Sequence, residues 1–138
     1  MSPSSQAAIL RDGASVIAQR LVGFAQGPIV EAAGSGGPSA SCEFISGHKR
    51  LELHFRAGLG LVRYHIGPVS LSHEEYMELK GVRDEAAYPG FPKLPLDSFV
   101  HLAQDIERFA TDFASGDGRE LIELQKLRRP VDPRRNLR

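Results

Sequence analysis

Apolar residues change their spacing twice along this chain, and each change predicts a change of secondary structure. Near the N-terminus they recur every three or four positions, the spacing of one helical face, at Leu10, Ala14, Ile17, Leu21 and Phe24. This spacing predicts a helix over about residues 6–25. The next stretch, residues 27–40, is rich in Gly, Pro, Ser and Ala, so we expect a loop there.

A period of two replaces the helical period over residues 42–69, as expected for half-buried strands. Turn signals at residues 47–48 and 57–58 divide this stretch, because glycine occurs in both pairs. The pattern therefore predicts an antiparallel meander of three or four strands.

A two-residue turn at 57–58 would pair residue 55 with 60 and set Glu52 opposite Arg63. Tyr64 would then point inward. The opposite, outward face would carry five basic or titratable side chains: Arg50, His54, Arg56, Arg63 and His65. Such a face is often simply solvated, but it is also the alternative site for a small molecule or a substrate. Nucleic acid is a less favoured ligand, because the tyrosine ring that could stack on bases points inward.

The helical period returns after the strands. The stretch LSHEEYMEL, residues 71–79, predicts a helix start with a capping box formed by Ser72 and Glu75. A stripe containing three phenylalanines predicts a helix over residues 97–115, and regularly spaced leucines predict a shorter one from about residue 119.

Together these patterns predict a single α+β domain over residues 1–129. It consists of an N-terminal helix, the antiparallel three- to four-stranded meander, and two or three C-terminal helices packed on one sheet face. Residues 130–138 are basic and interrupted by prolines, so we expect a flexible basic tail.

The composition, 41% hydrophobic and 25% charged residues, is close to the average for soluble globular proteins. No apolar run is long enough for a membrane span, and the N-terminus lacks the basic start of a signal peptide. We therefore expect a cytoplasmic, bacterial protein with no membrane association. Cys42 is the single cysteine, which excludes an intramolecular disulfide and favours a small core residue.

The net charge is zero, but the charge is unevenly distributed along the chain. Residues 68–125 contain twelve acidic residues against five basic ones, whereas residues 126–138 contain six basic residues against one acidic residue. This polarity indicates a partner of opposite charge more than it indicates a fold.

No motif in the sequence points to a metal or a catalytic centre. The segment starting at His73 resembles the zinc motif HExxH, but Met77 stands where the second histidine would be. In the register above, His54 and His65 lie too far apart to share a metal, and the chain has no nucleophile elbow. We therefore expect no metal, cofactor or catalytic residue, and we leave enzyme activity open with a preference against it.

Acidic residues on the first C-terminal helix and just after it are the candidates for binding a partner: Glu74, Glu78, Asp84 and Glu85. Two aromatic residues, Tyr88 and Phe91, lie between prolines in the following segment. They either fill the core or are presented as rigid aromatic anchors, and we include them as candidate contacts.

These features favour a small protein that binds another protein, for example an immunity protein that neutralises a basic toxin domain by direct contact. Two alternatives remain open. One is a small-molecule-binding protein or enzyme that uses the His/Arg face of the sheet, and the other is a structural homodimer.

Overall fold

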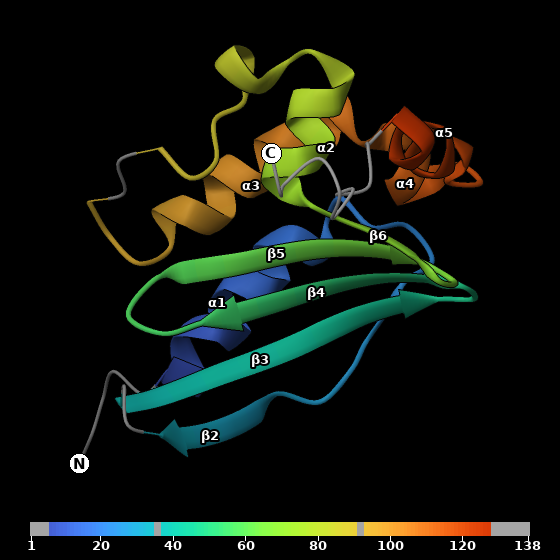
Figure 1. Cartoon of the computed structure of the whole chain (residues 1–138). Coiled ribbons are helices and arrows are strands. Elements are labelled where there is room, and N and C mark those ends of the chain that lie inside the picture. Colours follow the sequence, from blue (N-terminus) through green and yellow to red (C-terminus); the bar gives the residue numbers. More distant parts are fainter. Residues whose placement is uncertain (1–5, 35–36, 91–92, 128–138) are drawn as a thin grey trace, which may run out of the picture.

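The structure, a computed structural model, describes residues 6–34, 37–90 and 93–127 of the chain. It contains one antiparallel sheet and a set of helices (Figure 1), which confirms the predicted α+β class. The strands are β1 (Ala25–Gln26), β2 (Val30–Gly34), β3 (Gly37–Ser46), β4 (Lys49–Phe55), β5 (Leu59–Ile66) and β6 (Val69–Ser72). The helices are α1 (Gln6–Ala18), α2 (His73–Lys80), the 3₁₀ helix η1 (Arg83–Glu85), α3 (Asp97–Phe109), α4 (Thr111–Ser115) and α5 (Arg119–Leu127).

The sheet has the strand order β1-β3-β4-β5-β6, and β2 pairs with the same edge of β3 as β1 does. It is larger than the predicted meander, because residues 27–40, predicted as a loop, contain β2 and the beginning of β3. The small residues of this stretch give no clear alternation of apolar and polar positions. Backbone hydrogen bonds to β3 are enough to form a strand there all the same.

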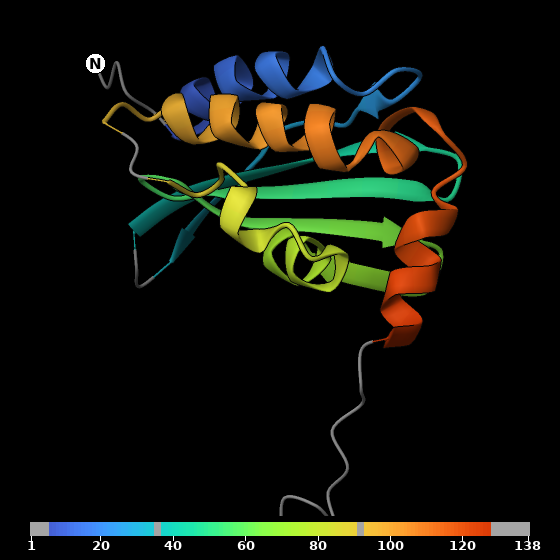
Figure 2. The same ribbon diagram turned by 90° about the horizontal axis from the view of Figure 1, so that it is seen from above.

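Helices cover one face of the sheet and leave the other face open. Figure 1 looks at the open face, with α1 behind the strands, and Figure 2 shows α1 and α3 side by side over the covered face. Helices α2 and α5 contact each other and the edge strand β6. Apolar side chains from the covered sheet face, α1 and α3 form one core.

Helix α1 ends at Ala18, so the prediction that it extends to residue 25 is wrong. The chain turns at Gly23, which has a φ of +80°, a conformation that favours glycine. Leu21 is nevertheless buried, and Phe24 packs against the core from outside the helix. The helical spacing of these residues therefore reflected burial in the turn, not helix.

The predicted pairing of β4 with β5 is confirmed at Glu52, which lies opposite Arg63, but not at the turn. Phe55 pairs with Leu59 rather than with residue 60, because the register shifts between His54 and Phe55. Ala57 in this turn has a positive φ of 58°, which alanine rarely adopts.

The predicted helix over residues 97–115 is interrupted. Helix α3 ends at Phe109, and Ala110, with a φ of −124°, separates it from α4. Phe99 and Phe113, on either side of the break, are fully buried. The Phe99 ring packs against Gly13 of α1 so closely that a Cβ placed at Gly13 would lie 2.4 Å from Cγ of the ring. Glycine at this position thus allows α1 and α3 to approach each other.

The predicted capping box of α2 is confirmed. Ser72 Oγ accepts from the Glu75 amide at 3.1 Å, and the Glu75 carboxylate accepts from the Ser72 amide at 2.9 Å. Gly81 ends the helix in a left-handed conformation. Within the described parts of the chain, no helix combines the length and apolarity needed to cross a membrane. The predicted tail, residues 130–138, lies outside the described residues.

Candidate functional site

Titratable side chains on the open sheet face form a continuous chain of hydrogen bonds, here called the open-face chain: Glu43, Arg50, His65, Glu52 and His54. Arg50 donates from Nη1 to Glu43 Oε2 at 2.7 Å and from Nη2 to His65 Nδ1 at 3.2 Å. The Glu52 carboxylate lies 2.8 Å from His65 Nε2 and 2.7 Å from His54 Nε2. The side chains come from three neighbouring strands, β3, β4 and β5.

The predicted register is confirmed, with His54 opposite Leu61 and His65 opposite Arg50, but the sequence did not predict that both imidazoles hydrogen-bond to the same carboxylate. His54 is two residues from Glu52 on the same strand and same face, and His65 is its diagonal neighbour on β5. Long side chains can bridge both separations. Burial raises the pKa of Glu52, but hydrogen bonds from the two histidines outweigh burial and lower it overall.

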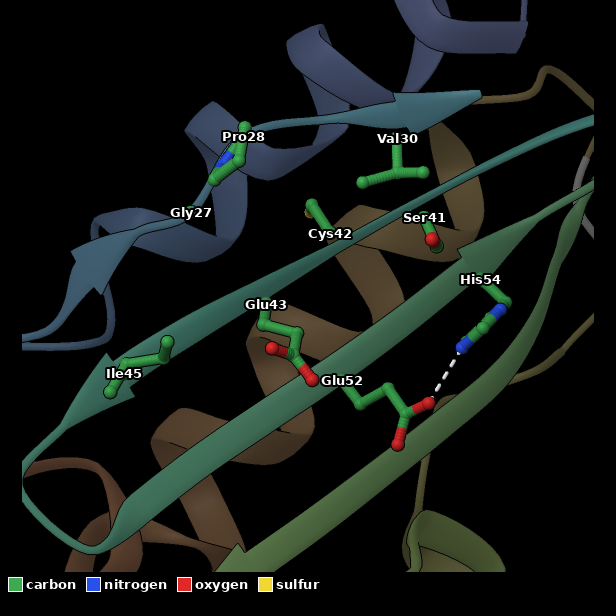
Figure 3. A pocket seen from close by; sticks show the side chains of 9 residues that line it. All are labelled: Gly27, Pro28, Val30, Ser41, Cys42, Glu43, Ile45, Glu52 and His54. Atoms are coloured by element: carbon green, nitrogen blue, oxygen red, sulfur yellow. Dashed lines mark hydrogen bonds and ion pairs between the residues drawn. The ribbon is translucent and has the colours of Figure 1, made fainter. Parts of the chain in front are cut away.

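Two carboxylates of the open-face chain come from residues directly opposite each other on neighbouring strands. Glu43 on β3 and Glu52 on β4 are cross-strand partners, and Figure 3 shows Glu43 extending from β3 toward β4 beside Glu52. Like charges in this position destabilise a sheet. The neighbouring Arg50 and the two histidines offset the repulsion at this point.

A hollow of about 230 Å³ opens on the same face (Figure 3). It forms between β1 and β2, which pair with different parts of the same side of β3. Gly27 still donates to Glu43 O at 2.7 Å, but Pro28 has no N–H to continue the pairing. The residues that line it are Gly27, Pro28, Val30, Ser41, Cys42, Glu43, Ile45, Glu52 and His54. The open-face chain therefore supplies one side of the hollow.

Two other residues predicted for this face, Arg63 and Arg56, do not join the open-face chain. Arg63 donates from Nε to Ser70 Oγ at 3.2 Å, and its Nη1 lies 4.0 Å from Glu75 Oε1, so it turns toward β6. Arg56 is exposed at the β4–β5 turn, beside a second hollow of about 300 Å³ that His54 also lines.

The predicted acidic contact residues form a ridge along α2 and η1, here called the acidic ridge: Glu74, Glu78, Asp84 and Glu85. All four are exposed. Glu78 pairs with Arg83 at 3.1 Å, with both side chains about two-thirds exposed (65% and 68%). Within the described parts of the chain, the carboxylates of the other three have no basic group within 4.0 Å.

Tyr88 is not available as a partner contact. Its ring is 6% exposed and packs edge-on against His73 at 5.3 Å, and its hydroxyl donates to Leu59 O at 2.6 Å. Tyr88 therefore fills the core, which is one of the two possibilities that the sequence left open. The second aromatic residue, Phe91, lies outside the described residues.

Tyr64, His73 and Asp105 form a buried hydrogen-bonded set that was not predicted from the sequence, here called the buried triad. The Tyr64 hydroxyl lies 2.8 Å from His73 Nδ1, and His73 Nε2 lies 2.9 Å from Asp105 Oδ2. Asp105 also accepts from the amides of Ala87 and Tyr88, at 2.6 and 2.9 Å. All three side chains are at most 1% exposed.

The partners of His73 indicate which of its ring nitrogens accepts and which donates. The Tyr64 hydroxyl satisfies its own hydrogen by donating to Nδ1, so the imidazole proton is on Nε2 and is donated to Asp105. Burial raises the pKa of the Tyr64 hydroxyl, which stays protonated. Burial also raises the pKa of Asp105, but its hydrogen bonds from His73, Ala87 and Tyr88 lower it overall.

The triad joins β5, α2, α3 and the segment that contains Ala87 and Tyr88. None of its residues lines either hollow described above, so it has the form of a structural core network. A signal was present in the sequence: His73 shares a helix face with Tyr76 and Met77, and Asp105 lies on the α3 stripe between Leu102 and Ile106. Both positions face the core by helical spacing.

Among the described residues, no group of three or more His, Cys, Asp and Glu side chains is arranged to hold a metal ion. Cys42 is buried, as predicted, and burial raises the pKa of its thiol to about 11. Its thiol is therefore protonated at neutral pH and a poor nucleophile.

Comparisons of the chain with protein-family models, with curated proteins and with solved structures find no match. Function is therefore argued from the acidic ridge, the open-face chain and the hollow.

Proposed function

We propose that this protein acts by binding the basic surface of another protein through its acidic ridge, as an immunity protein covers a toxin. The observation that supports this is the set of exposed carboxylates at Glu74, Asp84 and Glu85, none of which has a basic group within 4.0 Å among the described residues. An exposed carboxylate without an internal partner keeps its attraction for an external cation. Its desolvation on binding is offset only when such a cation arrives.

The position of the acidic ridge suits recognition more than stability. Helix α2 is held from the other side by the buried Tyr76 and Met77, while Glu74 and Glu78 on its outer side are exposed. The excess of acid over base in residues 68–125 adds a longer-range attraction. Such a field raises the association rate and makes binding sensitive to salt.

Affinity capture from the native host tests the proposal. The bait is the full chain, and the variant is the triple charge reversal Glu74→Lys, Asp84→Lys and Glu85→Lys. The matched control reverses three exposed acidic residues elsewhere, Asp12→Lys, Glu31→Lys and Glu123→Lys, with the same change of net charge. We expect the unchanged bait and the control to capture the same protein, and the ridge variant to lose it.

Equal capture by the ridge variant and the control would overturn the acidic ridge as the binding surface. Capture of no specific protein by the unchanged bait would overturn the proposed function itself.

A second function, ligand binding at the open sheet face, is favoured by the hollow and its convergent Glu43, Glu52 and His54. The size of the hollow limits it. Pockets for drug-sized ligands and cofactors measure about 300–1,000 Å³, whereas this one measures about 230 Å³. A single side chain or group of similar size fits it better than a whole cofactor.

A further inference from the structure

We infer that the hollow on the open sheet face receives an arginine side chain from a protein partner. This inference rests on the proposed function of protein binding, but it concerns a different surface from the acidic ridge. The acidic ridge lies on α2, which comes directly after the edge strand β6 in the chain, and on η1. The hollow lies at the opposite edge of the sheet, between β1, β2 and β3 (Figure 1).

The charge of the lining selects a cation. Glu43 on β3 and Glu52 on the adjacent β4 are cross-strand partners, and Arg50 is the only guanidinium of the open-face chain. Apart from its two histidines, the open-face chain has two carboxylates against one guanidinium, an excess of one negative charge. Glu43 uses Oε2 for Arg50, and no described residue donates to its Oε1. An incoming cation would find a free acceptor and relieve the carboxylate repulsion, whereas an anion would add to it.

The shape of the lining selects a long side chain with an apolar stem. Pro28, Val30 and Ile45 form the apolar part of the wall, and Val30 and Ile45 are 57% and 43% exposed. Large aliphatic side chains exposed beside carboxylates match a side chain with methylene groups and a charged end. Binding would remove these apolar surfaces from water while placing the charge between the two carboxylates.

Arginine suits the two carboxylates better than lysine does. Carboxylates on directly opposed strand residues have Cβ atoms about 5 Å apart, a separation that one planar guanidinium can bridge with several N–H groups. An ammonium group is a compact point charge and lacks this fork. From within the chain, Arg50 gives Glu43 a single hydrogen bond, from Nη1 to Oε2 at 2.7 Å.

Nuclear magnetic resonance of the ¹⁵N-labelled full chain tests the inference with a defined probe. The probe is N-acetyl-L-arginine methylamide, and the matched neutral probe is the citrulline analogue, which keeps the shape and lacks the charge. We expect the arginine probe to shift the amides of Val30, Ser41, Glu43 and Ile45 with a Kd on the order of 10 mM. The citrulline probe should shift them far less.

Variants separate the hollow from general charge attraction. Glu43→Gln should weaken binding of the arginine probe about tenfold, because it removes a charged hydrogen-bond acceptor. The control Glu31→Gln removes a carboxylate from an exposed residue of β2 that does not line the hollow, and it should leave the affinity unchanged. The ¹H–¹⁵N spectra of both variants without probe should retain the wild-type dispersion.

Three results would overturn the inference: no shift at the hollow, equal shifts by both probes, or equal weakening by Glu43→Gln and Glu31→Gln. These results leave the proposed function standing if the ridge variant still loses its partner. Conversely, specific arginine binding by a chain that captures no partner would mean a free arginine-like molecule as the ligand and would overturn the partner as its source.

Discussion

Two histidines in this protein make nearly the same hydrogen bonds in opposite surroundings. His73 accepts at Nδ1 from the Tyr64 hydroxyl and donates from Nε2 to Asp105. His65 accepts at Nδ1 from Arg50 and donates from Nε2 to Glu52. The His73 side chain is 1% exposed and the His65 side chain 16% exposed, and the carboxylates of Asp105 and Glu52 are 0% and 25% exposed.

The difference in solvation decides what each arrangement does. In the buried triad every polar atom depends on its partner, because water cannot replace a lost hydrogen bond. In the open-face chain, water replaces a lost partner at little cost. The same chemistry therefore stabilises the fold at one place and leaves groups available for a ligand at the other.

The largest effect expected from this contrast is that of Asp105→Ala. The change leaves His73 Nε2 and the amides of Ala87 and Tyr88 without their common acceptor in a closed core. We expect a loss of about 3–5 kcal/mol in the free energy of unfolding, measured by urea denaturation. A loss below about 1 kcal/mol would mean that water reaches the triad, and the contrast would fail.

A second prediction concerns acid. The pKa of Asp105 in the folded protein is lowered, whereas an unfolded aspartate titrates at about 3.9. The stabilisation by the carboxylate is therefore complete above about pH 4 and is lost as the pH falls through the lowered value. The stability advantage of wild type over Asp105→Asn should be full at pH 7 and smaller at pH 3. An advantage that grows on acidification would contradict this sign.

The sequence predicted the elements that are marked by a pattern of apolar and polar side chains. Alternation along β4 and β5 placed Glu52 opposite Arg63 correctly, and the capping box at Ser72 located the start of α2. Small residues hid β2, because Ala32, Ala33 and Gly34 give no alternation of apolar and polar side chains along a strand that pairs with β3. Such patterns report only the polarity of side chains, so they miss a strand that forms by backbone hydrogen bonding without such a pattern.

The sites were harder to predict than the fold. The buried triad was missed because a core-facing helix side is inferred from apolar residues, and His73 and Asp105 are polar residues at such positions. His54 and His65 meet at Glu52 because long side chains reach it along β4 from His54 and diagonally across from β5 in the case of His65. The register of the strands alone does not give this reach. The candidate acidic residues needed less information, because they were chosen by charge on the helix and just after it, and all four are exposed.

A third, smaller effect is expected at the open-face chain. Glu52→Gln removes the carboxylate shared by His54 and His65, but it also removes the repulsion with Glu43. We expect the free energy of unfolding to change by less than about 1 kcal/mol, measured under the same conditions as Asp105→Ala. A loss comparable to that of Asp105→Ala would show that the open-face chain is part of what holds the sheet together.

The smallest effect on stability is expected at Glu74, the residue next to His73 in the chain. Glu74 is exposed at the first turn of α2, whereas the His73 side chain points into the core. Glu74→Gln should shift the free energy of unfolding by no more than about 0.5 kcal/mol, and it should weaken capture of the protein partner.

His73→Gln should do the reverse, with a clear loss of stability and unchanged capture by the fraction that remains folded. Because the two residues are adjacent, a difference in chain position cannot explain opposite outcomes. Equal loss of stability in both variants would show that the helix start as a whole, rather than burial of one side chain, separates structure from function here.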